Sequence, residues 1–170
     1  ILPQRINEPS SYYAGVDLSD RVICRNVIVF ERRSRRTLQQ QQLSNRMHHR
    51  YVLVRVIKTP GVVSVDGQPI QLDVGDALLI CPYQFHHFVD LVSDQLRWIM
   101  ITFEVDRGDS MLTDLSYARL RPDSEADDLW SDIVRIWTSE KGERRAESLS
   151  ALDRLLMQLH AKSPSRSYLA

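Results

Sequence analysis

Two histidine pairs carry the side chains of this chain best suited to chemistry, because an imidazole can bind a metal, move a proton or hydrogen-bond a ligand. His86-His87 lies in one predicted strand and His48-His49 precedes another. Successive strand residues point to opposite faces, so His48 and His86 can share one face while their neighbours take the other. Two histidines fall short of the three protein ligands that a catalytic metal site normally needs. The pattern therefore favours a binding site over a metal-dependent active site.

The elements expected around these histidines are short strands. Asp66-Gly67 lies between alternating apolar residues and predicts a tight hairpin, because its primed turn needs two positive φ values. Strands are predicted at 22–30, 51–57, 62–65, 68–72, 77–80, 85–91 and 96–103. Short strands at close spacing, with no helices between them, predict a β-sandwich or barrel over residues 21–105.

Beyond residue 105 the apolar residues recur at helical spacing. We interpret residues 106–121 as a connecting loop. Asp123-Ser124 predicts a helix start, because such side chains cap the first turn, and Gly142 is placed to end that helix. A second helix is expected from about residue 143 to about residue 162. The fold class predicted is mainly β, with a two-helix hairpin over 122–162 appended to the barrel.

The second predicted helix carries leucines spaced three, four and three residues apart. Such an a/d series is typical of helices that associate, although a helix packed on its own barrel gives the same pattern. We expect this seam to form the interface of a homodimer. The interface residues predicted are Leu149, Leu152, Leu156 and Leu159.

The composition excludes some classes of partner. The net charge of +0 argues against a general attraction to nucleic acid or to an anionic membrane surface. No apolar run approaches the roughly 20 residues that span a bilayer, so no membrane partner is expected. The two cysteines lie in apolar, strand-like runs, which favours reduced thiols and a cytoplasmic protein. Residues 1–20 are interpreted as an N-terminal arm and residues 163–170 as the start of a linker.

The segment from Gly75 to His86 resembles the second motif of the cupin family, which runs Gly, five residues, Pro, one residue, Gly, two residues, His. Cys81 stands at the Pro position and Tyr83 at the second Gly position. The turns, the spacing and the terminal histidine are similar to those of cupins. The resemblance implies a double-stranded β-helix, or jelly-roll barrel.

The upstream cupin motif, His-x-His followed by Glu and Gly, is located by counting back through the hairpin. Arg46 and His48 then align with its two histidines, and Val52 aligns with its Glu. A valine cannot ligate a metal, and a guanidinium offers no lone pair for one. We therefore expect no metal, no cofactor and no catalytic residue. The alternative is a metal-dependent cupin enzyme, such as an isomerase or oxygenase.

The order of barrel, two helices and linker resembles the sensor domains of AraC-type transcription regulators, over about residues 51–160. This resemblance implies a non-enzymatic domain that binds a small effector in its barrel and dimerises. It also implies a C-terminal helix-turn-helix DNA-binding domain, which these residues do not include. The implied effector is a sugar or a partly apolar or aromatic metabolite.

The expected ligand site combines strand alternation with that resemblance. Alignment with a sugar-responsive member of the family places Phe88, Trp98 and Met100 at positions that line its pocket. On the last strand, either Trp98 and its alternate neighbours or Ile99 and its alternate neighbours face inward. The ligand-binding residues predicted are Arg46, His48, His86, Phe88, Trp98 and Met100.

Overall fold

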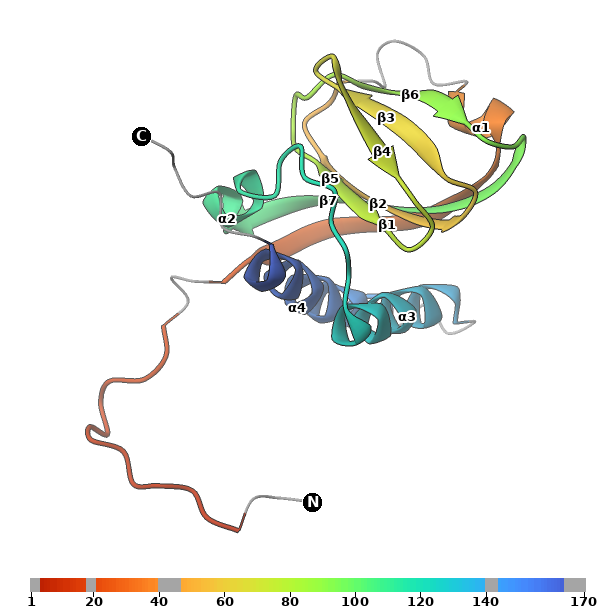
Figure 1. The fold of residues 1–170 in the computed structure, drawn as a ribbon. Coiled ribbons are helices and arrows are strands. Elements are labelled where there is room, and N and C mark those ends of the chain that lie inside the picture. Colours follow the sequence, from red (N-terminus) through yellow and green to blue (C-terminus); the bar gives the residue numbers. More distant parts are fainter. Residues whose placement is uncertain (1–3, 18–20, 40–46, 140–143, 164–170) are drawn as a thin grey trace.

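Two antiparallel sheets face each other and form the barrel (Figure 1). The computed structural model describes residues 4–17, 21–39, 47–139 and 144–163. The first sheet has the order β1 (Ile23–Ser34), β7 (Gln95–Arg107), β2 (Tyr51–Lys58) and β5 (Ala77–Ile80). The second has the order β4 (Gln68–Leu72), β3 (Gly61–Val65) and β6 (His86–Leu91). The predicted jelly-roll barrel with a helical appendage is confirmed.

The hairpin between β3 and β4 is the one predicted from sequence. Asp66 and Gly67 have φ values of 49° and 81°, as a primed turn requires. Val65 pairs with Gln68 directly across the turn. Asp66 also accepts a hydrogen bond from the backbone nitrogen of Phe85 at 2.8 Å, which ties the turn to the start of β6. This contact holds the approach to His86 in place.

Strand alternation sorts the four-stranded sheet into an inner and an outer face. Val52, Val54 and Val56 of β2 belong to the apolar interior of the barrel, as do Trp98 and Met100 of β7. The opposite row of the same strands belongs to a second apolar cluster, shared with the helices. The alternative left open by the sequence is thereby decided, because the set with Trp98 faces inward. The outward set of β7 comprises Ile99, Ile101 and Phe103.

Two helices cover the outer face of the four-stranded sheet (Figure 1). They are α3 (Ser124–Thr138) and α4 (Glu147–Lys162). Asp123 caps α3 as predicted, since its Oδ1 accepts a hydrogen bond from the backbone nitrogen of Ala126 at 3.0 Å. The second helix begins at Glu147, four residues later than expected. The predicted stop at Gly142 lies outside the described residues.

Most of the predicted dimer seam faces the chain's own core. Leu152, Leu156 and Leu159 are 0%, 0% and 4% exposed and pack in the cluster shared by the sheet and helices. Leu149 is only partly buried. The assignment of Leu152, Leu156 and Leu159 to a dimer interface is therefore wrong, since a partner cannot reach side chains that the sheet and α3 already cover. A helix packed on its own barrel produced the heptad-like spacing.

Two short helices were not predicted. The helix α1 (Arg35–Gln39) follows β1, and its Leu38 is 1% exposed within the interior of the barrel. The helix α2 (Asp109–Thr113) occupies part of the expected connecting loop and buries Leu112. A single helical turn shows no apolar period, so sequence periodicity cannot reveal it. Both β1 and β7 also extend beyond their predicted ends.

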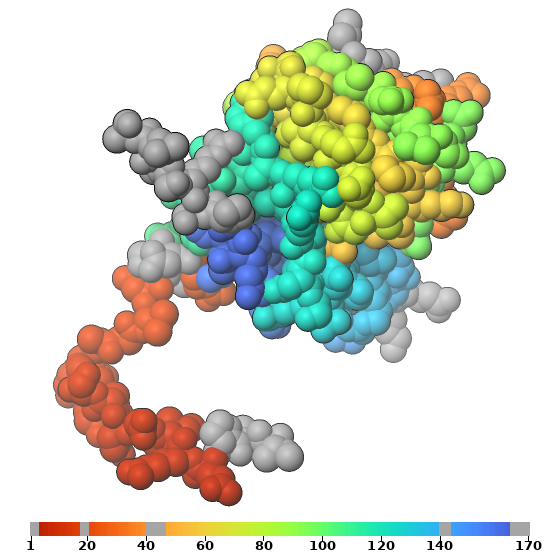
Figure 2. Space-filling view, viewed as in Figure 1, coloured from red at the N-terminus to blue at the C-terminus, as the bar shows by residue number. Residues whose placement is uncertain are grey.

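Residues 4–17 contain no helix or strand, and all of them are exposed. Figure 2 shows this segment apart from the barrel and the helices. Within the described part of the chain, no helix has the length and apolar character needed to cross a bilayer.

Candidate functional site

A cavity of about 170 Å³ lies in the barrel between the inner faces of the two sheets. Its wall is mainly apolar, with three polar side chains. The residues that line it are Phe30, His48, Val52, Ile80, His86, Phe88, Met100 and Thr102. β2, β5 and β7 supply part of this wall from inward positions on one sheet, and β6 supplies His86 and Phe88 from the other. The alternation that builds the barrel therefore also positions the site.

The two histidines approach each other at this cavity. Their ring centroids are 5.6 Å apart and their planes lie at 86°. The Nδ1 atom of His86 is 3.1 Å from the carbonyl oxygen of Gln84. The Nδ1 atom of His48 accepts a hydrogen bond from the backbone nitrogen of Arg50 at 3.2 Å. Each ring is thus held by its Nδ1 edge, which leaves Nε2 as its remaining polar atom.

The surroundings of both histidines favour the uncharged form of the ring. Burial lowers the pKa of His86 below its ordinary value of 6.5, and the neighbouring His48 and His87 lower it further. Burial is also the main reason that the pKa of His48 is lowered, with the charge of His49 adding to the effect. A neutral imidazole offers one donor and one acceptor. The cavity therefore presents hydrogen-bonding groups without net charge.

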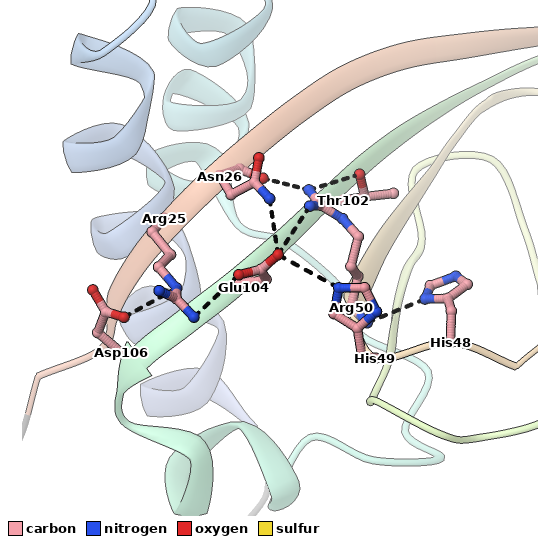
Figure 3. A network of polar contacts seen from close by, with 8 residues as sticks. All are labelled: Arg25, Asn26, His48, His49, Arg50, Thr102, Glu104 and Asp106. Atoms are coloured by element: carbon pink, nitrogen blue, oxygen red, sulfur yellow. Dashed lines mark hydrogen bonds and ion pairs between the residues drawn. The ribbon is translucent and has the colours of Figure 1, made fainter.

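Arg50 connects the cavity to a polar network at one end of the barrel (Figure 3). Its Nη2 donates to Thr102 Oγ1 at 3.2 Å, and its Nη1 donates to Glu104 Oε1 at 3.3 Å. It also donates to the carbonyl oxygen of Asn26. Because its backbone nitrogen bonds His48, one residue orients two of the three polar groups of the cavity.

Glu104 is the centre of that network (Figure 3). Its Oε1 accepts a hydrogen bond from Asn26 Nδ2 at 2.8 Å, and its Oε2 forms an ion pair with Arg25 Nη2 at 3.2 Å. The Nε2 atom of His49 lies 3.5 Å from Oε1. The hydrogen bond from Asn26 is the main reason that the pKa of Glu104 is lowered, and Arg25 and Arg50 lower it further. The guanidinium of Arg50 is already bonded to Glu104, Asn26 and Thr102, so its bonded nitrogen atoms are not free to serve as a separate anion site.

The sequence matches the family model of the AraC-like ligand binding domain over residues 29–167. This match begins within β1 and covers the rest of the barrel together with α3 and α4. The chain belongs to this family. No curated protein matches it.

Solved cupin structures are similar to this AraC-like domain at low identity. A cupin 2 conserved barrel domain protein from Rhodopseudomonas palustris is 22% identical, with a TM-score of 0.31, over 59% of this chain and 57% of that chain. A cupin 2 domain-containing protein from Halorhodospira halophila is 17% identical, with a TM-score of 0.34, over 74% and 84%. The salicylate 1,2-dioxygenase of Pseudoaminobacter salicylatoxidans is 21% identical, with a TM-score of 0.29, over 65% and 29%. The AraC-like domain thus spans little more than half of the first structure.

Four of the six predicted ligand residues of the AraC-like domain meet at the cavity. They are His48, His86, Phe88 and Met100. Trp98 is also inside the barrel but does not line this cavity. It is 0% exposed and donates from Nε1 to the carbonyl oxygen of Thr59 at 2.9 Å. Arg46 lies outside the described residues.

Trp98 is packed as a core residue from several sides. Its ring meets Phe88 edge-on, with centroids 5.6 Å apart. A Cβ atom added at Gly61 would lie 2.9 Å from Trp98 Cζ2, so the glycine makes room for the indole. With its N–H bonded and its faces covered, Trp98 supports Phe88 at the cavity wall. Phe30 and Phe88 are the phenyl side chains among the described residues that line the cavity.

Sequence reasoning did not assign Phe30 or Thr102 to the ligand site. Phe30 pairs with Met100 across β1 and β7, but irregular register between Arg25 and Ile28 hides the parity of β1. Thr102 shares its face with Met100 and is one of the alternate neighbours of Trp98, whose inward direction the sequence left open. Arg50, which orients His48, showed no signal in the sequence, because its role depends on one backbone nitrogen.

Few metal-ligating side chains gather at the cavity of the AraC-like domain. Across the described ranges, no cluster of three or more His, Cys, Asp or Glu residues could hold a metal ion. The cavity lining includes His48 and His86 but has Val52 where the cupin motif places Glu. Two imidazoles, with no third ligating side chain beside them among the described residues, fit an organic ligand better than a metal.

Proposed function

We propose that this chain is the effector-sensing domain of an AraC-type transcription regulator. A small molecule binds in the barrel, and its binding controls a helix-turn-helix DNA-binding domain located C-terminal to these residues. The cavity between His48 and His86 carries the proposal, because it is a partly polar space at the centre of a domain whose family is defined by ligand binding. We place the protein in the cytoplasm, where such a regulator meets both metabolite and DNA.

The proposed role is binding without catalysis. Two neutral histidines at the cavity can orient a ligand, and the described residues supply no third metal-ligating side chain beside them. The competing role is a metal-dependent isomerase or oxygenase. The two roles differ in metal content, which elemental analysis measures directly.

Ligand binding in the barrel is tested with a thermal-shift screen of sugars, aromatic acids, alcohols and phosphorylated metabolites. The informative variant is Val52→Trp, which fills the cavity, and Val89→Trp is its matched control because Val89 is 51% exposed. A true effector raises the melting temperature of wild type and Val89→Trp but not of Val52→Trp. Thr102→Tyr narrows the same cavity from a half-buried position, so it serves if Val52→Trp does not fold.

A hit that stabilises Val52→Trp, Thr102→Tyr and wild type equally would place the binding site outside the barrel and contradict the proposal. Circular dichroism of each variant checks that the fold is intact before the comparison is made.

We further propose that the domain acts as a homodimer through the outward side of α4. Leu149 and Met157 lie two helical turns apart and are only partly buried. Sedimentation should show a dimer for wild type and a folded monomer for Leu149→Asp combined with Met157→Asp. Ser131→Asp on the exposed side of α3 is the control and should remain dimeric. A wild-type monomer at tens of micromolar would reject this proposal.

A further inference from the structure

The two cavity histidines offer opposite hydrogen-bonding roles. A carbonyl oxygen only accepts, so the Nδ1 atom of His86 beside Gln84 must carry its proton. A neutral His86 then has an unprotonated Nε2, which is an acceptor. The Nδ1 atom of His48 accepts from the backbone nitrogen of Arg50, so the proton of neutral His48 lies on Nε2, which is a donor.

Neither Nε2 atom has a hydrogen-bond partner among the residues that the structure describes. A group that satisfies both must donate to His86 and accept from His48. A hydroxyl group does this with one oxygen atom, because it has one O–H donor and two lone pairs. A carboxylate or an ether only accepts, and an ammonium only donates. The pair therefore selects for a hydroxyl.

The size and the wall of the cavity restrict the rest of the ligand. Its volume of about 170 Å³ is close to that of an engineered apolar cavity of about 150 Å³ that holds benzene. The rings of Phe30 and Phe88 and the side chain of Ile80 supply apolar walls. No Asp, Glu, Lys or Arg is among the described lining residues, and Arg50 nearby is bonded to Glu104. A single uncharged ring fits this space, and a chain of sugar rings does not.

We propose that the effector is an uncharged single-ring alcohol or phenol, whose hydroxyl group donates to His86 Nε2 and accepts from His48 Nε2. This inference rests on the proposed function, since it assigns the ligand class of the same cavity. The ring packs against Phe30 and Phe88, and the hydroxyl fixes its orientation.

Calorimetric titration of the whole chain with four probes at neutral to mildly basic pH tests the ligand class. Phenol carries the hydroxyl, toluene has the same size without it, anisole accepts but cannot donate, and benzoate is charged. Phenol should bind at least about tenfold more tightly than toluene and anisole, because either leaves a buried histidine nitrogen unsatisfied. Benzoate should bind more weakly than phenol, because the described residues that line the cavity include no Lys or Arg.

The variant His86→Phe removes the acceptor and keeps an aromatic side chain of similar volume. It should bind phenol no more tightly than anisole, since both oxygens can then only accept a hydrogen bond from His48 Nε2. His87→Phe is the control, because His87 neighbours His86 on β6 but does not line the cavity. It should keep the wild-type preference for phenol.

Equal affinity of wild type for phenol, toluene and anisole would overturn the proposed hydroxyl bridge. Tighter binding of benzoate than of phenol would overturn the ligand class, and loss of that binding in Val52→Trp would leave the sensing function standing. If neither the probes nor the screened metabolites bind in a way that Val52→Trp abolishes, the ligand class and the sensing function both fail.

Discussion

The two faces of the four-stranded sheet differ in their packing, although the same strands form both. On the outer face, Leu53, Ile101 and Phe103 are 0% exposed and pack against α3 and α4 in one continuous cluster. On the inner face, Val52 and Met100 border a cavity of about 170 Å³ that also contains His48 and His86. Neighbouring residues of one strand therefore belong either to a closed core or to an open, partly polar space.

This difference shows which side of the sheet is built for stability and which for recognition. Close packing contributes most where every apolar atom has neighbours, as on the helix side. A cavity with unsatisfied polar atoms costs stability, and proteins retain such features mainly at binding sites. The two faces should consequently respond differently to the same kind of substitution.

The largest effect is expected from charges placed in the helix-side core. Leu152→Glu combined with Leu156→Glu should prevent folding, because each Leu is 0% exposed and an unpaired buried carboxylate costs several kcal/mol. Far-ultraviolet circular dichroism of the purified variant measures the outcome. Leu149→Glu, on a partly exposed position of the same helix, should fold. A folded double variant would show that α4 does not pack on the sheet as described.

A smaller loss of stability is expected from alanine substitutions in β7, and it should differ between two neighbouring residues. Ile101→Ala should lower the free energy of unfolding by an amount near the upper end of about 2–5 kcal/mol, because its surroundings are closed. Met100→Ala should lie near the lower end, because Met100 already borders empty space. Urea unfolding of both variants measures the difference. Equal losses would contradict the contrast between the two faces.

Acidic pH should destabilise the cavity side in particular. Burial lowers the pKa of His86 and His48 below 6.5 in the folded state, whereas unfolded histidines titrate near that value. Below about pH 6.5 the unfolded chain therefore binds more protons, and the free energy of unfolding falls as the pH decreases toward the folded pKa values. Above that window the contribution is fully present.

The pH dependence of unfolding in His86→Phe provides the comparison for that prediction. In this variant the free energy of unfolding should fall less steeply than in wild type as the pH is lowered from about 6.5 to the pH at which the protein unfolds. Asp66 and the carbonyl of Gln84 raise the pKa of His86 and so partly offset the effect of burial. The charges of His49 and Arg50 lower the pKa of His48 further. An unchanged pH profile in His86→Phe would show that this side chain does not titrate abnormally.

The smallest effect concerns metals. Protein purified without chelator should contain iron, manganese, nickel or zinc only well below one ion per chain, because His48 and His86 have no third ligand beside them in the described structure. Elemental analysis measures this content. A stoichiometric metal that is lost in His48→Phe would favour the enzymatic alternative.

Sequence reasoning predicted the barrel, the Asp66-Gly67 hairpin and the helical hairpin, because each depends on local turn chemistry or on apolar periodicity. It also brought His48 and His86 together through the resemblance to the two cupin motifs, while alternation turned His49 and His87 to the other face. It did not distinguish a helix that packs on its own sheet from one that binds a second copy, since the apolar spacing is the same. The contribution of Phe30 depends on an irregular register between strands, which no local pattern records.

The alternation along β7 has a mechanical consequence. Met100 lines the cavity, and Ile101 packs in the cluster that the sheet shares with the helices. Because the two residues are adjacent, one peptide unit joins them. When the inward side chains of a pleated strand are displaced, its outward side chains move with them. Because the outward side chains are densely packed against α3 and α4, the helices would shift together with the strand. Occupancy of the barrel can therefore be transmitted to α3 and α4 across the thickness of one strand, without a hinge or a moving lid.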